Sequence, residues 1–254
     1  MAAVLYESMN GIARITIHRP EARNAIDNEV VQGMQAAWQR FAQDADDRVA
    51  VLHGAGEQAF TSGADLKDMP RDIWLAIPNL SVPCDKPIIA AVNGFAVGAG
   101  ATMVMLSDMA VADEEARFIY PEAKIGAFAG VMAGFPPRMQ YKAGLEWLMT
   151  GDPMSAQRAY EIGLVNRLAA RGQALAVALE VAGRIAANAP LVVQAMKSIA
   201  RRTLPASPTE LYYPQQRLLQ GIANSDDLRE GVASFKEKRP PHFTVIREGV
   251  SRSS

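Results

Sequence analysis

The stretch VNGFAVGAGATMVMLSD, residues 92–108, decides the fold class, because its composition changes from strand-like to helix-like within a few residues. The apolar run that leads into it, from Ile88 to Asn93, predicts a fully buried strand. A turn containing Gly98 and Gly100 follows, and small residues then begin a helix. The first backbone N–H groups of a helix have no partner inside it, so they bind anions or a developing oxyanion. Close packing of the two glycines is the alternative explanation.

The same stretch raises the question of a membrane span. Residues 88–106 carry no charge over about the length that crosses a bilayer. Asn93, the glycines and Thr102 interrupt the apolar character, and β-branched residues give way to small ones partway along. A buried strand, a tight turn and a buried helix start explain this pattern better, so no membrane association is predicted.

Short apolar runs alternate with amphipathic patterns on both sides of this stretch. Strands are predicted at Val4–Tyr6, Ile12–His18, Arg48–His53, Ile88–Asn93 and Met109–Ala112. Asp27 is a suitable N-cap for a helix whose apolar residues recur at steps of three and four. These residues are Val30, Val31, Met34, Ala37, Trp38 and Phe41. Alternation of strands and helices predicts an α/β chain.

Helical patterns dominate after about residue 140. Ser155 is placed to cap a helix that Gly163 ends, and a short strand is predicted at Leu164–Leu168. Further helices are predicted at Gln173–Asn188, from Pro190 onward, at Thr209–Ala223 and at Ser225–Lys238. A boundary near Pro190 divides the chain into a core of residues 1–189 and a C-terminal helical region of residues 190–254.

Composition excludes several classes of protein. The 254 residues include 26 Lys and Arg against 27 Asp and Glu, whereas proteins that bind nucleic acid through phosphates show a basic excess. Cys84 is the only cysteine, which excludes an internal disulfide and fits a reducing, cytoplasmic compartment. The three histidines lack metal-ligand spacing, so no metal site is expected. The N-terminus shows no secretory signal pattern.

A second glycine-containing turn lies in AFTSGADLKDM, residues 59–69. Thr61, Ser62 and Gly63 interrupt any regular element, and a helix is predicted to begin over Leu66–Met69. A turn of this kind exposes backbone N–H groups. An ordinary turn capped by Asp65 is the alternative.

Two glycine-rich segments are similar in part to nucleotide-binding motifs. GAGEQA, residues 54–59, matches GxGxxA after a strand, but no helix can follow it and no acidic strand end lies about twenty residues further on. The segment at residues 98–103 fails at its last position. Neither GxxxxGK[ST] nor GxSxG occurs, so a P-loop and a hydrolase nucleophile elbow are excluded.

Glu122 lies in FIYPEAKIGAF, residues 118–128, directly after Pro121. Apolar surroundings raise the pKa of a carboxylic acid and suit it to proton transfer near neutral pH. A role as the first residue of a helix is the alternative for Glu122.

Four segments, taken in order, resemble the crotonase (enoyl-CoA hydratase/isomerase) superfamily: AFTSGADLKDM, DKPIIAAVNGFAVGAGATMVMLSD, FIYPEAKIGAF and GLVNRL. HRPEARNAID near the start and EGVASFKEKRPPHF near the end are also similar to family segments, so the resemblance covers about residues 4–243. It implies an α/β fold, a spiral of ββα turns with a C-terminal helical region that forms a homotrimer or a dimer of trimers. The substrate would be an acyl-CoA thioester, with coenzyme A as part of the substrate and no further cofactor.

The resemblance also implies roles for individual residues. The backbone N–H groups of Ala64 and Ala99 would stabilise a thioester enolate, and Glu122 would act on protons. Residues expected to contact the acyl-CoA are Arg23, Ala25, Ala64, Asp65, Leu66, Gly98 and Thr102, with Phe235 and Lys238 supplied by an adjoining subunit. Lys236, Lys238 and Arg239 add local positive charge near the adenosine end, or are simply solvated helix charges.

Thr102 departs from the hydratase pattern, because it occupies the position of the first of two glutamates in family hydratases. A hydroxyl group orients water but is no base near neutral pH. Isomerisation of an enoyl-CoA double bond by Glu122 alone is therefore favoured. A hydratase that adds water to a 2-enoyl-CoA and a catalytically silent acyl-CoA-binding relative are the alternatives. The apolar, lengthened segment at residues 126–138 suggests a hydrophobic acyl group.

Overall fold

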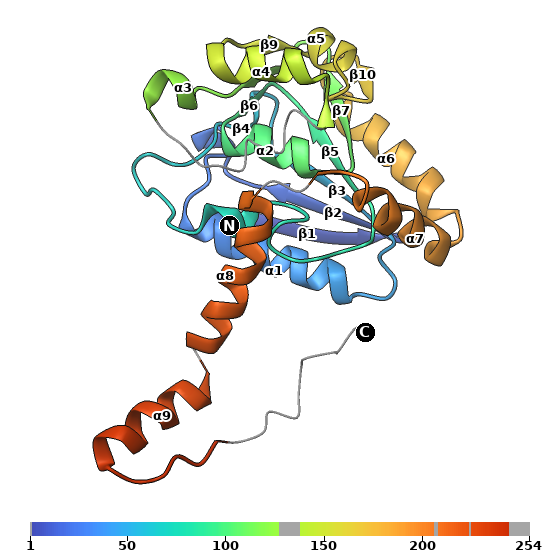
Figure 1. Cartoon of the computed structure of the whole chain (residues 1–254). Helices are drawn as coiled ribbons and strands as arrows, with labels where there is room; N and C mark the ends of the chain where they lie inside the picture. Colours follow the sequence, from blue (N-terminus) through green and yellow to red (C-terminus); the bar gives the residue numbers. More distant parts are fainter. Residues whose placement is uncertain (1, 127–137, 206–207, 224, 244–254) are drawn as a thin grey trace. The chain divides into compact units, whose positions relative to one another are not determined.

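The computed structural model describes residues 2–126, 138–205, 208–223 and 225–243 (Figure 1). The chain separates into two compact units, Met1–Glu210 and Leu211–Ser254. The sequence places its boundary near Pro190 instead. Helix α7 (Pro190–Arg201) belongs to the first unit because its Lys197 is bound to Asp108 and Asn79 of that unit.

A six-stranded sheet forms the body of the first unit. Its strands, in spatial order, are β1 (Val4–Met9), β2 (Ile12–Ile17), β3 (Val49–Gly54), β5 (Ile88–Val92), β7 (Met109–Asp113) and β10 (Arg167–Ala169). β1 pairs with β2 in antiparallel orientation, and every other pair in this sheet is parallel. The interior strands are buried on both faces, which explains why they read as continuous apolar runs.

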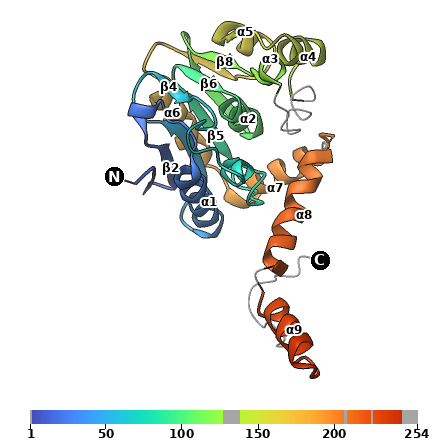
Figure 2. The same cartoon turned by 90° about the vertical axis from the view of Figure 1, so that its left-hand side faces the viewer.

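A second, four-stranded sheet contains β4 (Ala59–Thr61), β6 (Phe95–Val97), β8 (Arg117–Ile119) and β9 (Met154–Ser155), in that order. Figure 2 labels β4, β6 and β8 of this sheet. β4, β6 and β8 are parallel neighbours, and β9 runs antiparallel to β8. The chain passes from a large-sheet strand to a small-sheet strand and then to a helical segment three times. These helical segments are η2 (Ile73–Ala76), α2 (Ala99–Leu106) and α3 (Glu122–Ile125). This is the repeated ββα order that the family resemblance implies.

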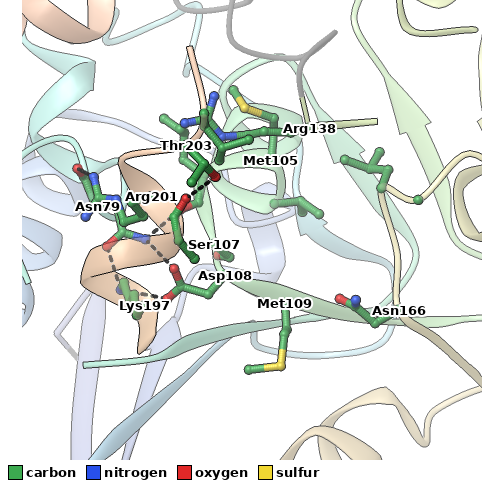
Figure 3. A pocket seen from close by; sticks show the side chains of 16 residues that line it. Asn79, Met105, Ser107, Asp108, Met109, Arg138, Asn166, Lys197, Arg201 and Thr203 are labelled. Atoms are coloured by element: carbon green, nitrogen blue, oxygen red, sulfur yellow. Dashed lines mark hydrogen bonds and ion pairs between the residues drawn. The ribbon is translucent and has the colours of Figure 1, made fainter. Parts of the chain in front are cut away.

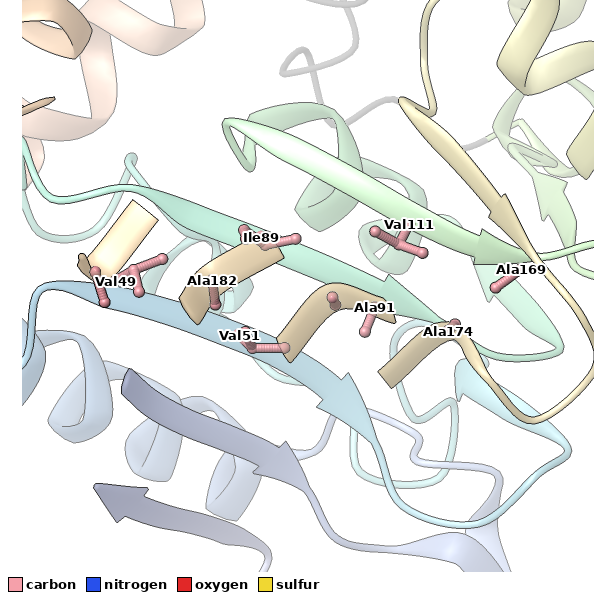
Figure 4. Packing of buried hydrophobic residues seen from close by; sticks show 10 residues of the cluster. Val49, Val51, Ile89, Ala91, Val111, Ala169, Ala174 and Ala182 are labelled. Carbon is pink, nitrogen blue, oxygen red and sulfur yellow. The ribbon is translucent and has the colours of Figure 1, made fainter. Parts of the chain in front are cut away.

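Helix α6 (Ala174–Ala186) packs against the large sheet through alanines spaced four residues apart (Figure 4). Ala174, Ala178, Ala182 and Ala186 are all buried on this face. Small side chains allow the helix to approach the valines and isoleucines of the sheet closely. Strand residues Val49, Val51, Ile89 and Val111 supply the opposing surface.

Helix α1 (Asn28–Gln43) begins where the sequence predicts. The side chain of Asp27 accepts a hydrogen bond from the Val30 N–H at 2.8 Å, which is an N-cap interaction. The six apolar residues predicted for its inner face are all buried. The Ser155 cap of α5 (Ala156–Glu161) is confirmed in the same way, since its hydroxyl accepts from the Arg158 N–H at 3.1 Å.

Two predicted elements are wrong in position or kind. No helix forms over Leu66–Met69, because the Asp65 carboxylate accepts the Lys67 N–H at 3.0 Å and closes a local turn instead. The strand predicted at Leu164–Leu168 begins only at Arg167. The N–H groups of Leu164 and Val165 both bind the Ala159 carbonyl, so these residues still complete the end of α5.

Helix α4 (Tyr141–Thr150) lies in the first unit, and α8 (Pro208–Ala223) continues into the second. The second unit ends its described part with α9 (Asp226–Glu237), which Ser225 caps. No single helix in the described ranges is long and apolar enough to cross a membrane; α6 and α7 together pass that criterion of length and composition, with a bend of 109° between them.

Candidate active site

The site lies where three parallel strands of the small sheet end. β4 leads into Ser62–Ala64, β6 into Gly98 and Ala99, and β8 into Tyr120–Glu122. The register pairs Thr61 with Ala96 and Val97 with Ile119, so these ends are adjacent. Parallel strands place their carboxyl ends at one edge of a sheet, where open α/β sheets bind ligands. The structure therefore brings Ala64, Ala99 and Glu122 to one edge.

Ala64 is held by a parallel bridge to Ile26. The Ile26 N–H donates to the Gly63 carbonyl and the Asp65 N–H donates to the Ile26 carbonyl, both at 2.8 Å. Successive peptide groups of an extended chain point to opposite sides, so the N–H of Ala64 faces away from Ile26. Within the described part of the chain this N–H donates no hydrogen bond. It is available to a ligand.

Ala99 is the first residue of α2, and Gly98 precedes it with φ 52° and ψ −110°. L-residues with a side chain rarely adopt this conformation, so the turn requires glycine. The N–H of Ala99 is one of the four amides at the start of a helix that have no intrahelical acceptor. Among the described residues it has no other acceptor either. The positive end of the helix dipole adds to its attraction for an anion.

Glu122 carries the one carboxyl group that the sequence assigns to proton transfer. Its Oε1 lies 3.1 Å from the position that a Cβ would occupy on Gly98. Its Oε2 is buried and has no hydrogen-bond partner among the described residues. Burial raises the pKa of Glu122 to about 7. This carboxyl group can therefore both accept and donate a proton near neutral pH.

Thr102 is buried on the first turn of α2, and its hydroxyl donates to the Gly98 carbonyl at 3.3 Å. That contact ties the helix to the turn that carries the Ala99 N–H. No hydrogen bond between Thr102 and Glu122 occurs in the described ranges. The side chain thus supports the turn rather than forming a pair with the carboxyl group.

Arg23 and Ala25 lie in the loop beside the first N–H group. The Ser62 N–H donates to the Arg23 carbonyl at 3.0 Å, which joins this loop to the end of β4. Leu66, two residues beyond Ala64, is strongly exposed. These contacts join the loop of Arg23 and Ala25, the rim loop, to the segment of Ala64, Asp65 and Leu66, and the pairing of β4 with β6 brings the end of β4 beside the turn of Gly98 and Ala99.

A family model described as enoyl-CoA hydratase/isomerase matches residues 7–245. The chain belongs to the enoyl-CoA hydratase/isomerase family. It is 35% identical to (E)-benzylidenesuccinyl-CoA hydratase of Thauera aromatica, over 94% of this chain and 98% of that protein. It is also 35% identical to carnitinyl-CoA dehydratase of Salmonella typhi, over 95% of this chain and 98% of that protein.

Solved structures in the family have the same fold. A carnitinyl-CoA dehydratase from Mycobacterium avium 104 matches with a TM-score of 0.76 and 37% identity, over 96% of this chain and 99% of that one. An enoyl-CoA hydratase from Mycobacterium tuberculosis H37Rv matches with a TM-score of 0.76 and 36% identity, over the same shares. The predicted crotonase fold is confirmed, and the protein is an acyl-CoA enzyme of this family.

Other residues that the family resemblance implies belong to the second unit. Phe235 is exposed on α9, and Lys238 ends that helix with φ 51°. Their contact with coenzyme A stays a prediction. Arg239 binds the carboxylates of Glu230 and Glu237, so it adds no free positive charge to the predicted basic cluster. Residues 127–137, which hold most of the predicted acyl-pocket segment, lie outside the described residues.

Asn24 lies between Arg23 and Ala25 in the same loop, and the sequence analysis did not identify it as a candidate. Its side chain is fully buried, and its Nδ2 donates to the carbonyls of Ala55 and Ala59 at 2.9 and 2.8 Å. These contacts fix the rim loop against the start of β4. The one sequence feature that could have identified Asn24 is its position in HRPEARNAID, a segment that resembles the family.

A cavity of about 510 Å³ lies at the other end of α2 (Figure 3). Its wall includes Met105, Asp108 and Lys197. The Lys197 ammonium donates to Asp108 at 2.7 Å, Asn79 at 2.9 Å and the Lys86 carbonyl at 2.7 Å, so all three of its hydrogens are engaged. This cavity contains none of the groups at the strand ends. In the described ranges, no group of three or more His, Cys, Asp or Glu side chains is placed to hold a metal ion.

Proposed function

We propose that this enzyme moves a proton beside the thioester carbonyl of an acyl-CoA. Glu122 carries the proton, and the N–H groups of Ala64 and Ala99 hold the enolate oxygen that forms. The single observation that carries the proposal is the position of Glu122: its carboxyl group, with Oε2 buried and the pKa raised to about 7, is adjacent to the Gly98 turn that presents the Ala99 N–H.

The chemistry follows from where charge develops. Removal of a proton from carbon 2 leaves the electron pair delocalised onto the thioester oxygen. Two fixed N–H donors aimed at that oxygen stabilise the transition state by about 3–4 kcal/mol each, because they need no reorganisation. Glu122 holds the proton, which can exchange with water there, and then returns a proton to carbon, so atoms and charge balance without a further reagent.

Isomerisation of a 3-enoyl-CoA to a 2-enoyl-CoA needs only these groups. Glu122 takes the proton from carbon 2 and returns it at carbon 4, while the double bond moves into conjugation with the carbonyl. The absence of a second carboxyl group at Thr102, whose hydroxyl is bound to the Gly98 carbonyl, supports this reaction.

Hydration of a 2-enoyl-CoA, or the reverse dehydration, is the second candidate. The names of the relatives support it, since those quoted above are a hydratase and a dehydratase. In this reaction Glu122 exchanges a proton with water or with the leaving hydroxyl group. The Thr102 hydroxyl would then have to release the Gly98 carbonyl to hold the water.

Proton NMR of turnover in deuterated water distinguishes the two reactions. A 3-enoyl-CoA and a 2-enoyl-CoA are supplied separately, each to the native protein and to Glu122→Gln. Double-bond migration without a hydroxylated product supports isomerisation. A 3-hydroxyacyl product from the 2-enoyl substrate assigns hydration instead, and no reaction of either kind contradicts both.

We also propose that the chain assembles as a homotrimer or a dimer of trimers, with Phe235 and Lys238 of an adjoining subunit beside the coenzyme A. Exposed apolar residues on α7, namely Leu191, Met196 and Ile199, support an assembly that covers them. Sedimentation equilibrium tests this proposal: a mass of three or six chains supports it, and a monomer contradicts it.

A further inference from the structure

Arg19 lies in the loop before α1 and has a partly buried guanidinium group with three acceptors. Its Nη1 donates to the Ala25 carbonyl at 2.8 Å and to Asp65 Oδ2 at 3.1 Å. The same nitrogen lies 2.9 Å from Asp27 Oδ2. One cation therefore joins the neighbouring residues Ala25 and Asp27 to Asp65, which lies 46 residues from Arg19 in the sequence.

These three residues surround the Ile26–Ala64 bridge. Ala25 and Asp27 are the residues on either side of Ile26, and Asp65 directly follows Ala64. The bridge determines the direction of the Ala64 N–H, because Ile26 uses the peptide groups on both sides of Ala64. Arg19 is thus bound to both strands of the bridge at once.

The loop that carries Ile26 needs such support. Arg23 and Asn24 both have left-handed backbone conformations, with φ values of 52° and 56°, which side chains disfavour. The Arg19 N–H donates to Asn24 Oδ1 at 3.0 Å, so the backbone of Arg19 also fixes this turn. Loss of the guanidinium group would leave the carboxylates of Asp27 and Asp65 facing one position without a cation between them, and their repulsion would separate the two segments.

We propose that Arg19 is a positioning residue for the oxyanion hole. Its guanidinium group clamps the Ile26–Ala64 bridge and so keeps the Ala64 N–H aimed at the substrate oxygen. This inference rests on the proposed function for its catalytic consequence, whereas the clamp itself is a property of the folded chain.

Arg14 provides a matched control. It is an arginine on β2 whose guanidinium group forms an ion pair with Glu7, with the two side chains 39% and 53% exposed. It has no contact with the rim loop. Exposed ion pairs of this kind contribute little to stability, so Arg14→Gln removes a charge of the same sign without removing the clamp.

The experiment compares Arg19→Gln with Arg14→Gln in the full chain by two measurements. Amide hydrogen exchange followed by NMR reports on the Ile26 and Asp65 N–H groups, which are the donors of the bridge. Steady-state kinetics on an enoyl-CoA reports kcat and KM. Arg19→Gln is expected to speed exchange of both amides at least tenfold and to lower kcat about 100-fold, since a displacement of about 1 Å in an active site has that effect.

Arg19→Lys and the double variant Arg19→Gln/Asp65→Asn show whether charge at this point is responsible. The lysine keeps a cation and should recover part of kcat. Asp65→Asn removes one of the two opposed carboxylates, so the double variant should exchange more slowly at these amides than Arg19→Gln alone.

Unchanged amide protection in folded Arg19→Gln would overturn the clamp. Faster exchange with kcat unchanged would overturn the positioning role. The exchange measurement does not depend on turnover, so a native protein without enoyl-CoA activity contradicts the proposed function while the clamp is still judged by its amides.

Discussion

Oε1 of Glu122 and the α-carbon of Gly98 face one another so closely that a Cβ on residue 98 would lie 3.1 Å from that oxygen. The carboxyl group proposed to carry the proton is therefore adjacent to the turn that presents the Ala99 N–H, without ordinary room for a side chain on residue 98. Because Glu122 follows β8 and Gly98 follows β6, the pairing of those two strands is what sets this separation.

Gly98→Ala tests the contact. The new methyl group crowds Glu122, and φ 52° is unfavourable for alanine, so the turn and the carboxyl group both shift. We expect kcat to fall about 100-fold or more and the free energy of unfolding to fall by about 1–2 kcal/mol. Kinetics and urea unfolding measure the two effects. Gly163→Ala is the control for a left-handed glycine, since a Cβ there meets no atom within 4 Å.

The pH dependence of kcat/KM reports the protonation state of Glu122 in the free enzyme. Burial raises its pKa to about 7, and proton abstraction requires the ionised form. For the isomerase reaction we therefore expect kcat/KM to rise about tenfold per pH unit below about pH 7 and to level off above it. A profile that is already flat from pH 5 upward would contradict the role of Glu122 as the base.

Thr102→Glu tests the hypothesis that this site favours isomerisation over hydration because residue 102 carries no carboxyl group. A second carboxyl group on the first turn of α2 adds the base that the hydroxyl cannot supply, so hydration of a 2-enoyl-CoA should increase several-fold. Thr102→Gln has a side chain of similar size without the charge and should show no increase. Equal hydration rates for both variants would mean that carboxylate chemistry at residue 102 is irrelevant.

Lys197→Met is expected to lower the stability of the fold and to leave catalysis nearly unchanged. Its ammonium group is buried beside Asp108, and burial lowers the pKa of Lys197. Removal of one partner of a buried pair leaves the other uncompensated, so we expect a loss of about 3 kcal/mol in the free energy of unfolding with kcat of the folded protein changed less than about twofold. Lys142→Met, at an exposed position of α4, is the control. Urea unfolding and kinetics together check the prediction.

The sequence predicts the parts of this fold that local patterns determine. Buried strands such as β5 follow from continuous apolar runs, and α1 follows from the Asp27 cap and its apolar face. The positions of Ala64, Ala99 and Glu122 come from family motifs, and their meeting at one sheet edge follows once β4, β6 and β8 are known to be parallel neighbours.

Long-range contacts account for most of what the sequence did not predict. The Arg19 clamp and the Lys197–Asp108 pair join residues 46 and 89 positions apart, and no local pattern encodes such pairings. The Asp65 turn replaced a predicted helix because a side-chain acceptor competes with helical hydrogen bonds. The sequence predicts that Arg239 belongs to a basic cluster. In the structure the chain after α9 turns back, and this turn brings Arg239 and the His242 N–H to the carboxylate of Glu230.

Deuterium incorporation from deuterated water into an enoyl-CoA, followed by proton NMR with native protein and with Glu122→Gln, tests the central claim most directly. Glutamine keeps the shape of the side chain and removes its acid–base function. We predict incorporation with the native protein and a loss of at least about 100-fold in the variant, within the range for general acid–base catalysis. Incorporation at the native rate by a folded Glu122→Gln protein would contradict the account.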